Sequence, residues 1–160
     1  NHYFCKMNWI ISKSEKIEFD TNLSAVLKPL EDVLEDYQFF ISDYLFISEN
    51  KNLPFKNFSS NYEILSADML KEILKDKVQF IWLYLAAIPK SEEILIDEEN
   101  LPYIEGNPDI WEAGFQMKNA VFELYAYDSS YTIIKFKNQE HSELFKEYFR
   151  EAERLEEYQF

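Results

Sequence analysis

Two segments near the C-terminus alternate between apolar and polar side chains, a pattern typical of strands that bury one face. They span residues 120–127 and 131–137 and are separated by Asp128-Ser129-Ser130. A three-residue loop would pair residues whose numbers sum to 258, which places Glu123 opposite Lys135 and keeps the apolar side chains together. A two-residue loop would split the apolar face, because a slip of one residue turns every side chain over. The pattern therefore predicts a β-hairpin with the three-residue loop.

The polar face of this hairpin also holds aromatic residues, namely Tyr125, Tyr127 and Tyr131, together with Ile133. Cross-strand aromatic pairs that stiffen the sheet would explain them. A second packed layer or a surface for a partner protein would explain them equally well. The sequence leaves these three interpretations open.

Two longer apolar stretches predict buried strands. Residues 78–88 are apolar on both faces, which favours a central strand covered on both sides. Residues 37–47 form either one buried strand or a hairpin that turns at Ser42-Asp43, and the polar pair favours the hairpin. Shorter strands are expected at about 3–11, at 62–65 and around Ile17 and Phe19.

Three helices are predicted from apolar side chains that recur every three or four residues. The first follows an N-cap at Asp20 or Thr21, and Pro29 inside it either kinks the helix or marks its first turn. Ser66 caps the second helix, and Asn138 caps a long third helix. The apolar side of the third helix comprises Leu144, Phe145, Tyr148, Phe149, Ala152 and Leu155.

These elements predict a single α+β domain over residues 1–160, with a mostly antiparallel sheet and about three helices packed on it. The chain has 160 residues, of which 47% are hydrophobic and 18% are aromatic. That composition suffices for a sizeable core, and the length suits one domain. Disordered chains lack such apolar and aromatic content.

The charge of the chain narrows the classes of partner. Lys and Arg number 16 while Asp and Glu number 30, which gives a formal net charge of −14. A negative field disfavours nucleic acid and anionic membranes, because phosphate groups are bound by Lys and Arg, whereas a basic protein would be attracted. The longest apolar run, residues 78–88, is about half a membrane span. The start of the chain lacks the pattern of a signal peptide, so we expect a cytoplasmic protein.

Few residues suit catalysis or cofactor binding. The chain has two glycines and neither of the glycine-rich phosphate-binding motifs, so no nucleotide or other cofactor is expected. One cysteine and two histidines exclude the common zinc patterns, and no metal site is expected. Cys5 is predicted to be a small buried apolar residue rather than a nucleophile, and His141 a solvated residue at the start of the last helix.

Residues 92–112 are strongly acidic and contain no Lys or Arg. An EF-hand is excluded, because the sixth and twelfth positions counted from Asp97 are proline instead of Gly and Glu. A solvated loop, a looser divalent-cation site and a hydrolase site with paired carboxylates all remain open. We favour a surface for a basic protein, since aromatic anchors supply buried area and carboxylates supply steering. The candidate binding residues are Glu98, Glu99, Tyr103, Glu105, Asp109, Trp111 and Glu112.

The segments IWLYLAAIPK (81–90) and AYDSSYTIIKFK (126–137) resemble small uncharacterised bacterial domains, some of which are polymorphic-toxin immunity proteins. The resemblance covers about the C-terminal two-thirds of the chain and consists of strand patterns rather than catalytic signatures. Immunity proteins of that kind bind and block a toxin without chemistry. The resemblance therefore implies a bacterial, cytoplasmic, non-enzymatic protein, and it assigns a role to no residue.

The first functional hypothesis is a non-catalytic interaction protein, immunity- or antitoxin-like, that binds a basic protein. The alternative is a small-ligand binder or a hydrolase with a carboxylate pocket, which requires two buried acids of raised pKa in a deep site. A homodimer or structural subunit is the third hypothesis.

Overall fold

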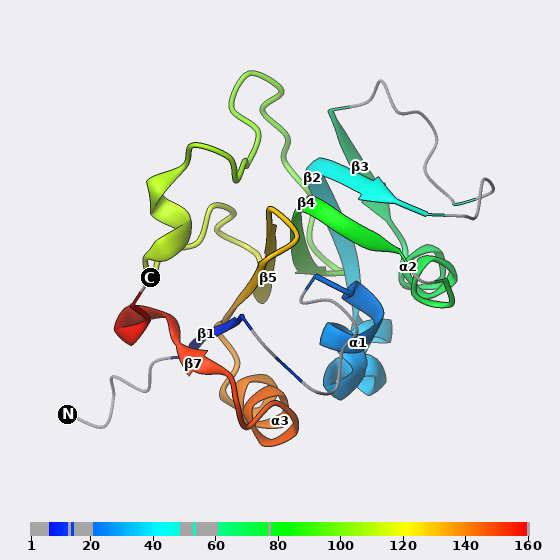
Figure 1. The fold of residues 1–160 in the computed structure, drawn as a ribbon. Coiled ribbons are helices and arrows are strands. Elements are labelled where there is room, and N and C mark those ends of the chain that lie inside the picture. The colour runs from blue at the N-terminus through cyan, green and yellow to red at the C-terminus, as the bar shows by residue number, and fades with distance from the viewer. Residues whose placement is uncertain are drawn as a thin grey trace.

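A seven-stranded antiparallel sheet with the order β3-β2-β4-β5-β6-β1-β7 forms the centre of the protein (Figure 1). The computed structural model describes residues 7–12, 14, 21–48, 53, 61–76 and 78–159. The strands are β1 (Asn8–Ile11), β2 (Tyr37–Ile47), β3 (Tyr62–Leu65), β4 (Gln79–Pro89), β5 (Phe122–Tyr127), β6 (Tyr131–Phe136) and β7 (Glu153–Arg154). The helices are α1 (Leu23–Leu27), α2 (Ala67–Leu74) and α3 (Gln139–Tyr148), with 3-10 helices η2 (Lys28–Asp36), η3 (Pro108–Trp111) and η4 (Leu155–Glu157). The predicted α+β class, a mostly antiparallel sheet with about three helices, is confirmed.

The predicted register of the C-terminal hairpin is also confirmed. Every pair between β5 and β6 sums to 258, including Glu123 opposite Lys135. The loop takes the three residues that the pattern requires, with Asp128 and Ser129 in the left-handed region at φ 48° and 59°. Asp tolerates that region better than most residues, which suits it to the first loop position.

Strand β2 corrects the preference for a hairpin at Ser42-Asp43. The strand continues through this pair and runs along β4 from Tyr37 to Ile47, with a shift of register between Ser42 and Leu45. Asp43 has a φ of 47°, so the polar pair forms a bulge rather than a turn. The long β4 strand supplies backbone partners on both sides of the bulge, which favours a continuous ladder.

The first helix begins one residue later than predicted and changes type at the proline. Asn22, not Asp20 or Thr21, is the N-cap, and its side chain accepts a hydrogen bond from the Ala25 amide at 3.3 Å. Asp20 lies outside the described residues, as do Cys5, Ile17 and Phe19. Pro29 lies at the start of η2, where its missing N–H costs no helical hydrogen bond.

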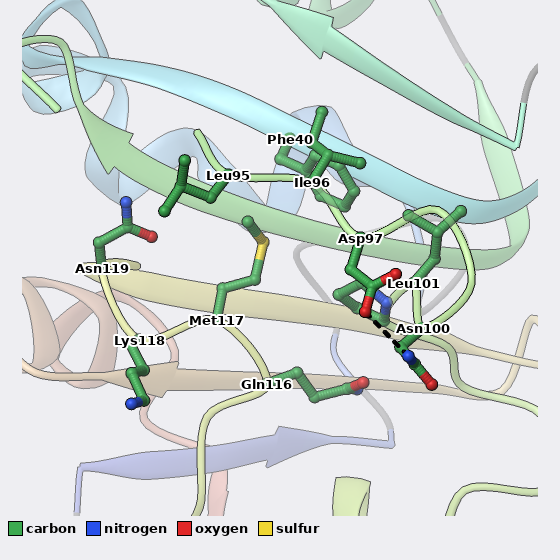
Figure 2. A pocket seen from close by; sticks show the side chains of 11 residues that line it. Phe40, Leu95, Ile96, Asp97, Asn100, Leu101, Gln116, Met117, Lys118 and Asn119 are labelled. Atoms are coloured by element: carbon green, nitrogen blue, oxygen red, sulfur yellow. Dashed lines mark hydrogen bonds between the residues drawn. The ribbon is translucent and has the colours of Figure 1, made fainter. Parts of the chain in front are cut away.

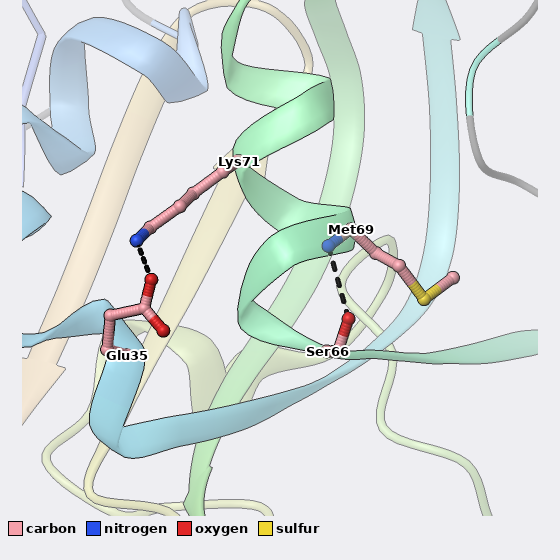
Figure 3. A network of polar contacts seen from close by, with 4 residues as sticks. All are labelled: Glu35, Ser66, Met69 and Lys71. Atoms are coloured by element: carbon pink, nitrogen blue, oxygen red, sulfur yellow. Dashed lines mark hydrogen bonds and ion pairs between the residues drawn. The ribbon is translucent and has the colours of Figure 1, made fainter.

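The predicted cap of α2 is confirmed, because the Ser66 hydroxyl accepts from the Met69 amide at 3.2 Å (Figure 3). Lys71 from the same helix bonds to Glu35 of η2, so one ion pair joins two elements of the helical layer. The Lys71 ammonium lowers the pKa of Glu35. Both side chains are partly exposed, so the pair adds little stability.

Helix α3 starts at the predicted cap, Asn138, but is shorter than the apolar spacing suggested. It ends at Tyr148, where Lys146 donates hydrogen bonds to the carbonyl groups of Arg150 and Ala152 and so stabilises the turn away from the helix. Ala152 and Leu155 are buried, but they belong to the segment that follows the helix. The apolar spacing predicts a buried Leu144, whereas this side chain is 44% exposed.

The two faces of the sheet are both covered, because side chains alternate along each strand. Leu83 and Leu85 of β4 join a core under the helices, while Tyr84 and Ala86 join a second core on the opposite face. The predicted central strand covered on both sides is therefore confirmed. In Figure 1 the helices and the yellow-green segment 90–121 lie on opposite sides of the sheet. None of the helices in the described residues is long and apolar enough to span a bilayer.

His141 corrects the expectation of a solvated side chain. It is 6% exposed and its ring meets the edge of Tyr37, with 5.9 Å between ring centres. Its Nδ1 atom is buried without a hydrogen-bond partner among the residues that the structure describes. Burial lowers the pKa of His141, and the carboxylates of Glu140 and Asp36 oppose that effect only in part.

This environment predicts that acidification destabilises the fold through His141. Below about pH 6.5 the unfolded chain binds a proton at this residue, whereas the folded protein does so only at lower pH. Folding stability is therefore lost as the pH falls from 6.5 through the lower pKa of the folded state. Urea unfolding of the unaltered protein and of His141→Gln at neutral and acid pH measures this, and the variant should lose less stability on acidification. An equal loss in both proteins would show that His141 contributes nothing to the pH dependence.

Candidate functional site

The second face of the sheet is covered by an irregular segment, residues 90–121, called the covering segment below. It contains one short helix, η3, and no strand. Its Ile104, Ile110 and Ala120 are almost fully buried against the sheet residues Tyr125 and Ile133. The three tyrosines on this face of the hairpin thus belong to a second packed layer. The solvated-loop interpretation of residues 92–112 is wrong for the buried side chains of Ile104 and Ile110.

A buried carboxylate holds one end of the covering segment on the sheet. Glu123 is 0% exposed and accepts hydrogen bonds from the hydroxyl groups of Tyr84 and Tyr125, the latter at 2.6 Å. It also accepts from the backbone amides of Gln116 at 3.0 Å and of Met117 at 2.9 Å. Burial, and then the Glu123 charge, raise the pKa of both tyrosines. Every oxygen of this carboxylate is therefore occupied within the protein.

A buried lysine holds the middle of the covering segment. Lys135 is also 0% exposed and donates to the carbonyl oxygens of Gly114 at 2.8 Å and Asp109 at 3.3 Å. Its ammonium lies 4.9 Å from the centre of the Tyr125 ring. Burial lowers the pKa of Lys135 to about 8, against the attraction of Glu123 on the neighbouring strand. The Glu123–Lys135 pair is buried under the segment, instead of lying on a solvated face of the hairpin.

Hydrogen bonds from the bulge in β2 hold a third stretch of the covering segment. Ser42 donates to the Pro102 carbonyl at 2.7 Å, and the Asp43 carboxylate accepts from the Ile104 amide at 2.7 Å. The Gln116 side chain both donates to the Tyr103 carbonyl and accepts from the Tyr103 amide. Polar groups on and near the sheet thus replace the strand ladder that this segment lacks.

The acidic candidate residues point to solvent. Tyr103 is 48% exposed, whereas Trp111 is half-buried and meets the ring edge of Tyr127, with 5.0 Å between ring centres. Trp111 therefore packs against the second core and is not an exposed aromatic anchor for a partner. The carboxylates that lie on the exposed surface are those of Glu98, Glu99, Glu105, Asp109 and Glu112.

The structure gathers only some of these residues. Tyr103, Asp109 and Glu112 line one polar hollow of about 370 Å³. Glu98 and Glu99 lie on a separate turn, in which the Asp97 carboxylate accepts from the Glu99 amide at 3.1 Å. Glu105 lines neither this hollow nor the apolar one described next.

An apolar hollow of about 420 Å³ lies between two parts of the covering segment, residues 95–102 and 116–119, which are called its two limbs below (Figure 2). Leu95 and Met117 face each other across it, and Phe40 of β2 also lines it. Sequence reasoning missed this feature because it weighed the acids of the segment. The sequence does contain an indication of this hollow, namely the apolar run at 94–96 inside an acidic stretch. Three consecutive apolar side chains cannot all point to one buried face, so at least one of them is left at the surface. The remaining lining residues are Ile96, Asp97, Asn100, Leu101, Pro102, Gln116, Lys118 and Asn119.

A hydrolase site with paired carboxylates requires two acids that converge. The buried acids among the described residues are Glu63 and Glu123. Glu63 pairs with Ile41 of the helix-covered face, whereas Glu123 pairs with Ala86 of the opposite face, so the sheet separates them. Among the residues that the structure describes, no three His, Cys, Asp or Glu side chains form a group that could hold a metal ion. The buried acids of the described residues therefore do not form a paired-carboxylate site.

The arrangement of this site consists of exposed carboxylates and an apolar hollow on a segment that buried polar groups hold on the sheet. Its interpretation rests on the geometry of this chain. Comparison with protein-family models, with curated proteins and with solved structures found no match.

Proposed function

We propose that this protein is a non-catalytic interaction protein that binds a basic protein partner through the outer surface of the covering segment. The observation that supports this most directly is the division of side chains in that segment: its isoleucines face the sheet, and its carboxylates face solvent. A net charge of −14 adds long-range attraction for a cationic surface. In this proposal the protein is an immunity-like factor of the bacterial cytoplasm.

The fastening of the covering segment supports the same proposal. Glu123, Lys135 and Asp43 hold its backbone at separate points, so the exposed acids are presented on a fixed surface. A fixed surface loses less conformational entropy on binding than a mobile loop does. Tyr103 supplies an exposed aromatic side chain at the edge of this surface, a residue type enriched in interfaces.

Charge reversal on the covering segment tests the proposal. The partner to test first is the product of the gene next to the one that encodes this chain. We expect Glu98→Lys combined with Glu99→Lys to weaken binding about tenfold, mainly through a slower association rate. We also expect affinity to fall as salt rises from about 50 to about 300 mM, because salt screens exposed charges. Titration calorimetry and stopped-flow kinetics measure the two effects.

A matched control separates the position of the charges from their number. Glu143→Lys combined with Glu147→Lys makes the same change in net charge on exposed positions of α3, which covers the other face of the sheet. This control should alter affinity much less than the first pair does. A complex that is indifferent to salt and to both pairs of substitutions would contradict the proposal.

A small-molecule site is the second candidate function, and the apolar hollow is the observation that favours it. A volume of about 420 Å³ lies within the range of small-ligand pockets. Against it, the lining residue Leu95 is 79% exposed, so much of the hollow's rim is open to solvent. Ligand pockets normally enclose most of the surface of the bound molecule.

A further inference from the structure

We infer that the apolar hollow receives an apolar side chain of the protein partner, and that Arg or Lys residues flank that side chain in the partner sequence. The inference rests on the proposed function, because it specifies which part of a basic partner meets the covering segment. Its basis is the juxtaposition of an open apolar surface with unneutralised carboxylates.

The floor and walls of the hollow are apolar. Phe40 rises from the sheet, while Leu101 and Met117 come from the two limbs of the covering segment. Leu95 is the most exposed large apolar side chain among the described residues, at 79%. An exposed leucine beside an apolar hollow gains free energy when another apolar group covers both.

The turn beside the hollow carries negative charge that the protein does not neutralise. The Asp97 carboxylate is occupied by the Glu99 amide and by the Asn100 side chain at 2.8 Å, as the dashed line in Figure 2 shows for the latter. The carboxylates of Glu98 and Glu99 are exposed and make no hydrogen bond or ion pair within the described part of the chain. The turn that contributes Asp97 to the lining of the hollow therefore carries three carboxylates in succession, Asp97, Glu98 and Glu99, and no cation.

One cation lies at the rim, at the opposite end from this turn. Lys118 lines the hollow, but in Figure 2 its side chain points away from Met117 and out of the hollow. It therefore leaves the negative charge of Glu98 and Glu99 in place. An occupant with an apolar centre and cationic flanks matches the floor and the acidic turn together.

The same charges argue against other occupants. A second copy of this chain would bring its own net charge of −14 to the same acidic turn, which opposes association. Anionic lipid surfaces and nucleic acid are repelled for the same reason. A neutral small molecule would use the floor of the hollow but leave the carboxylates unpaired.

The test is a titration of the full chain, labelled with ¹³C at its Leu and Met methyl groups, with three short peptides. The probes are Arg-Arg-Leu-Arg-Arg, Arg-Arg-Gly-Arg-Arg and Glu-Glu-Leu-Glu-Glu, each acetylated and amidated, at low salt. We expect the first peptide to shift the methyl signals of Leu95, Leu101 and Met117. It should bind about tenfold more tightly than the glycine peptide, the factor expected for burying one leucine side chain. The acidic peptide should not bind.

Two leucine variants locate the effect. Leu95→Ala removes an exposed side chain beside the hollow, and Leu144→Ala removes an exposed side chain from α3 on the other face. Only Leu95→Ala should reduce the tenfold preference for the leucine peptide over the glycine peptide. Because both positions are exposed, both variants should fold, which methyl spectra without peptide will verify.

The outcomes separate the inference from the proposed function. Equal binding of the leucine and glycine peptides would overturn the inference while leaving electrostatic binding by the covering segment intact. Equal binding of the acidic peptide would also overturn it, because the hollow would then be a general apolar site. If neither arginine peptide shifts any signal from the covering segment, the proposed function fails together with the inference.

Discussion

Replacing Glu123 with alanine is expected to destabilise the protein by roughly 3–5 kcal/mol, because several buried hydrogen-bond donors lose their acceptor at about 1–3 kcal/mol each. The substitution leaves Lys135 charged and buried without its neighbour, and it removes the acceptor of two tyrosine hydroxyl groups and two backbone amides. Each unsatisfied buried group adds a desolvation cost. Urea unfolding followed by tryptophan fluorescence gives the free energy of unfolding by linear extrapolation.

Three further variants give this experiment its controls. Glu98→Ala removes an exposed carboxylate and should change stability by at most about 0.5 kcal/mol. Glu123→Gln keeps one acceptor oxygen, so its loss should be smaller than that of the alanine variant. Adding Lys135→Met to Glu123→Gln removes the unpaired charge and should recover part of the loss. A loss below about 1 kcal/mol in Glu123→Ala would contradict the role assigned to this carboxylate.

The second large effect is expected in the core beneath the helices. Phe145→Ala should cost about 3–5 kcal/mol, since the removed ring leaves a cavity in a packed interior. Phe145 is 0% exposed and its ring centre lies 5.7 Å from that of Phe136 and 5.0 Å from that of Phe149. Thermal or urea unfolding measures the loss.

The neighbouring residue supplies the matched control for Phe145→Ala. Leu144 is 44% exposed, so Leu144→Ala should cost less than about 1 kcal/mol, and the high helix propensity of alanine reduces the cost further. The comparison tests the orientation of α3, because the apolar spacing alone assigned both residues to the buried side. Similar losses in the two variants would mean that the helix is rotated from the orientation described above.

The parts of the fold that could be predicted from the sequence are those with a regular side-chain period. Alternation along residues 120–137 determined the hairpin register, because a shift of one residue would have exposed every apolar side chain. The helix caps were also predictable, because a cap depends on residues close in the sequence. Ser66 and Asn138 each accept a hydrogen bond from an amide three residues away. The first helix shows the limit of this reasoning, since several polar residues precede it and Asn22 is the one that caps.

The features that could not be predicted depend on contacts between residues far apart in the sequence. Ser42-Asp43 has the composition of a turn, and its role as a bulge depends on Pro102 and Ile104, about sixty residues later. The covering segment has no helical or strand period, so nothing in its sequence indicates which side packs on the sheet. Glu123 is buried because the covering segment packs over it, and His141 is buried because η2 and Tyr37 pack against α3. The acidic candidate residues are exposed, as a surface role requires, but the apolar hollow could not be predicted from the sequence.

The way in which the covering segment is attached has a consequence for how this protein can change. Its backbone is positioned by side chains of the sheet, such as Asp43 of β2 and Lys135 of β6, and not by its own outward side chains. Substitutions at exposed positions such as Glu98, Glu105 or Glu112 therefore leave folding almost unaffected, and under the proposed function they would alter which partner this surface binds. Such a separation allows new binding specificities to be selected, in nature or in a library, on one unchanged framework.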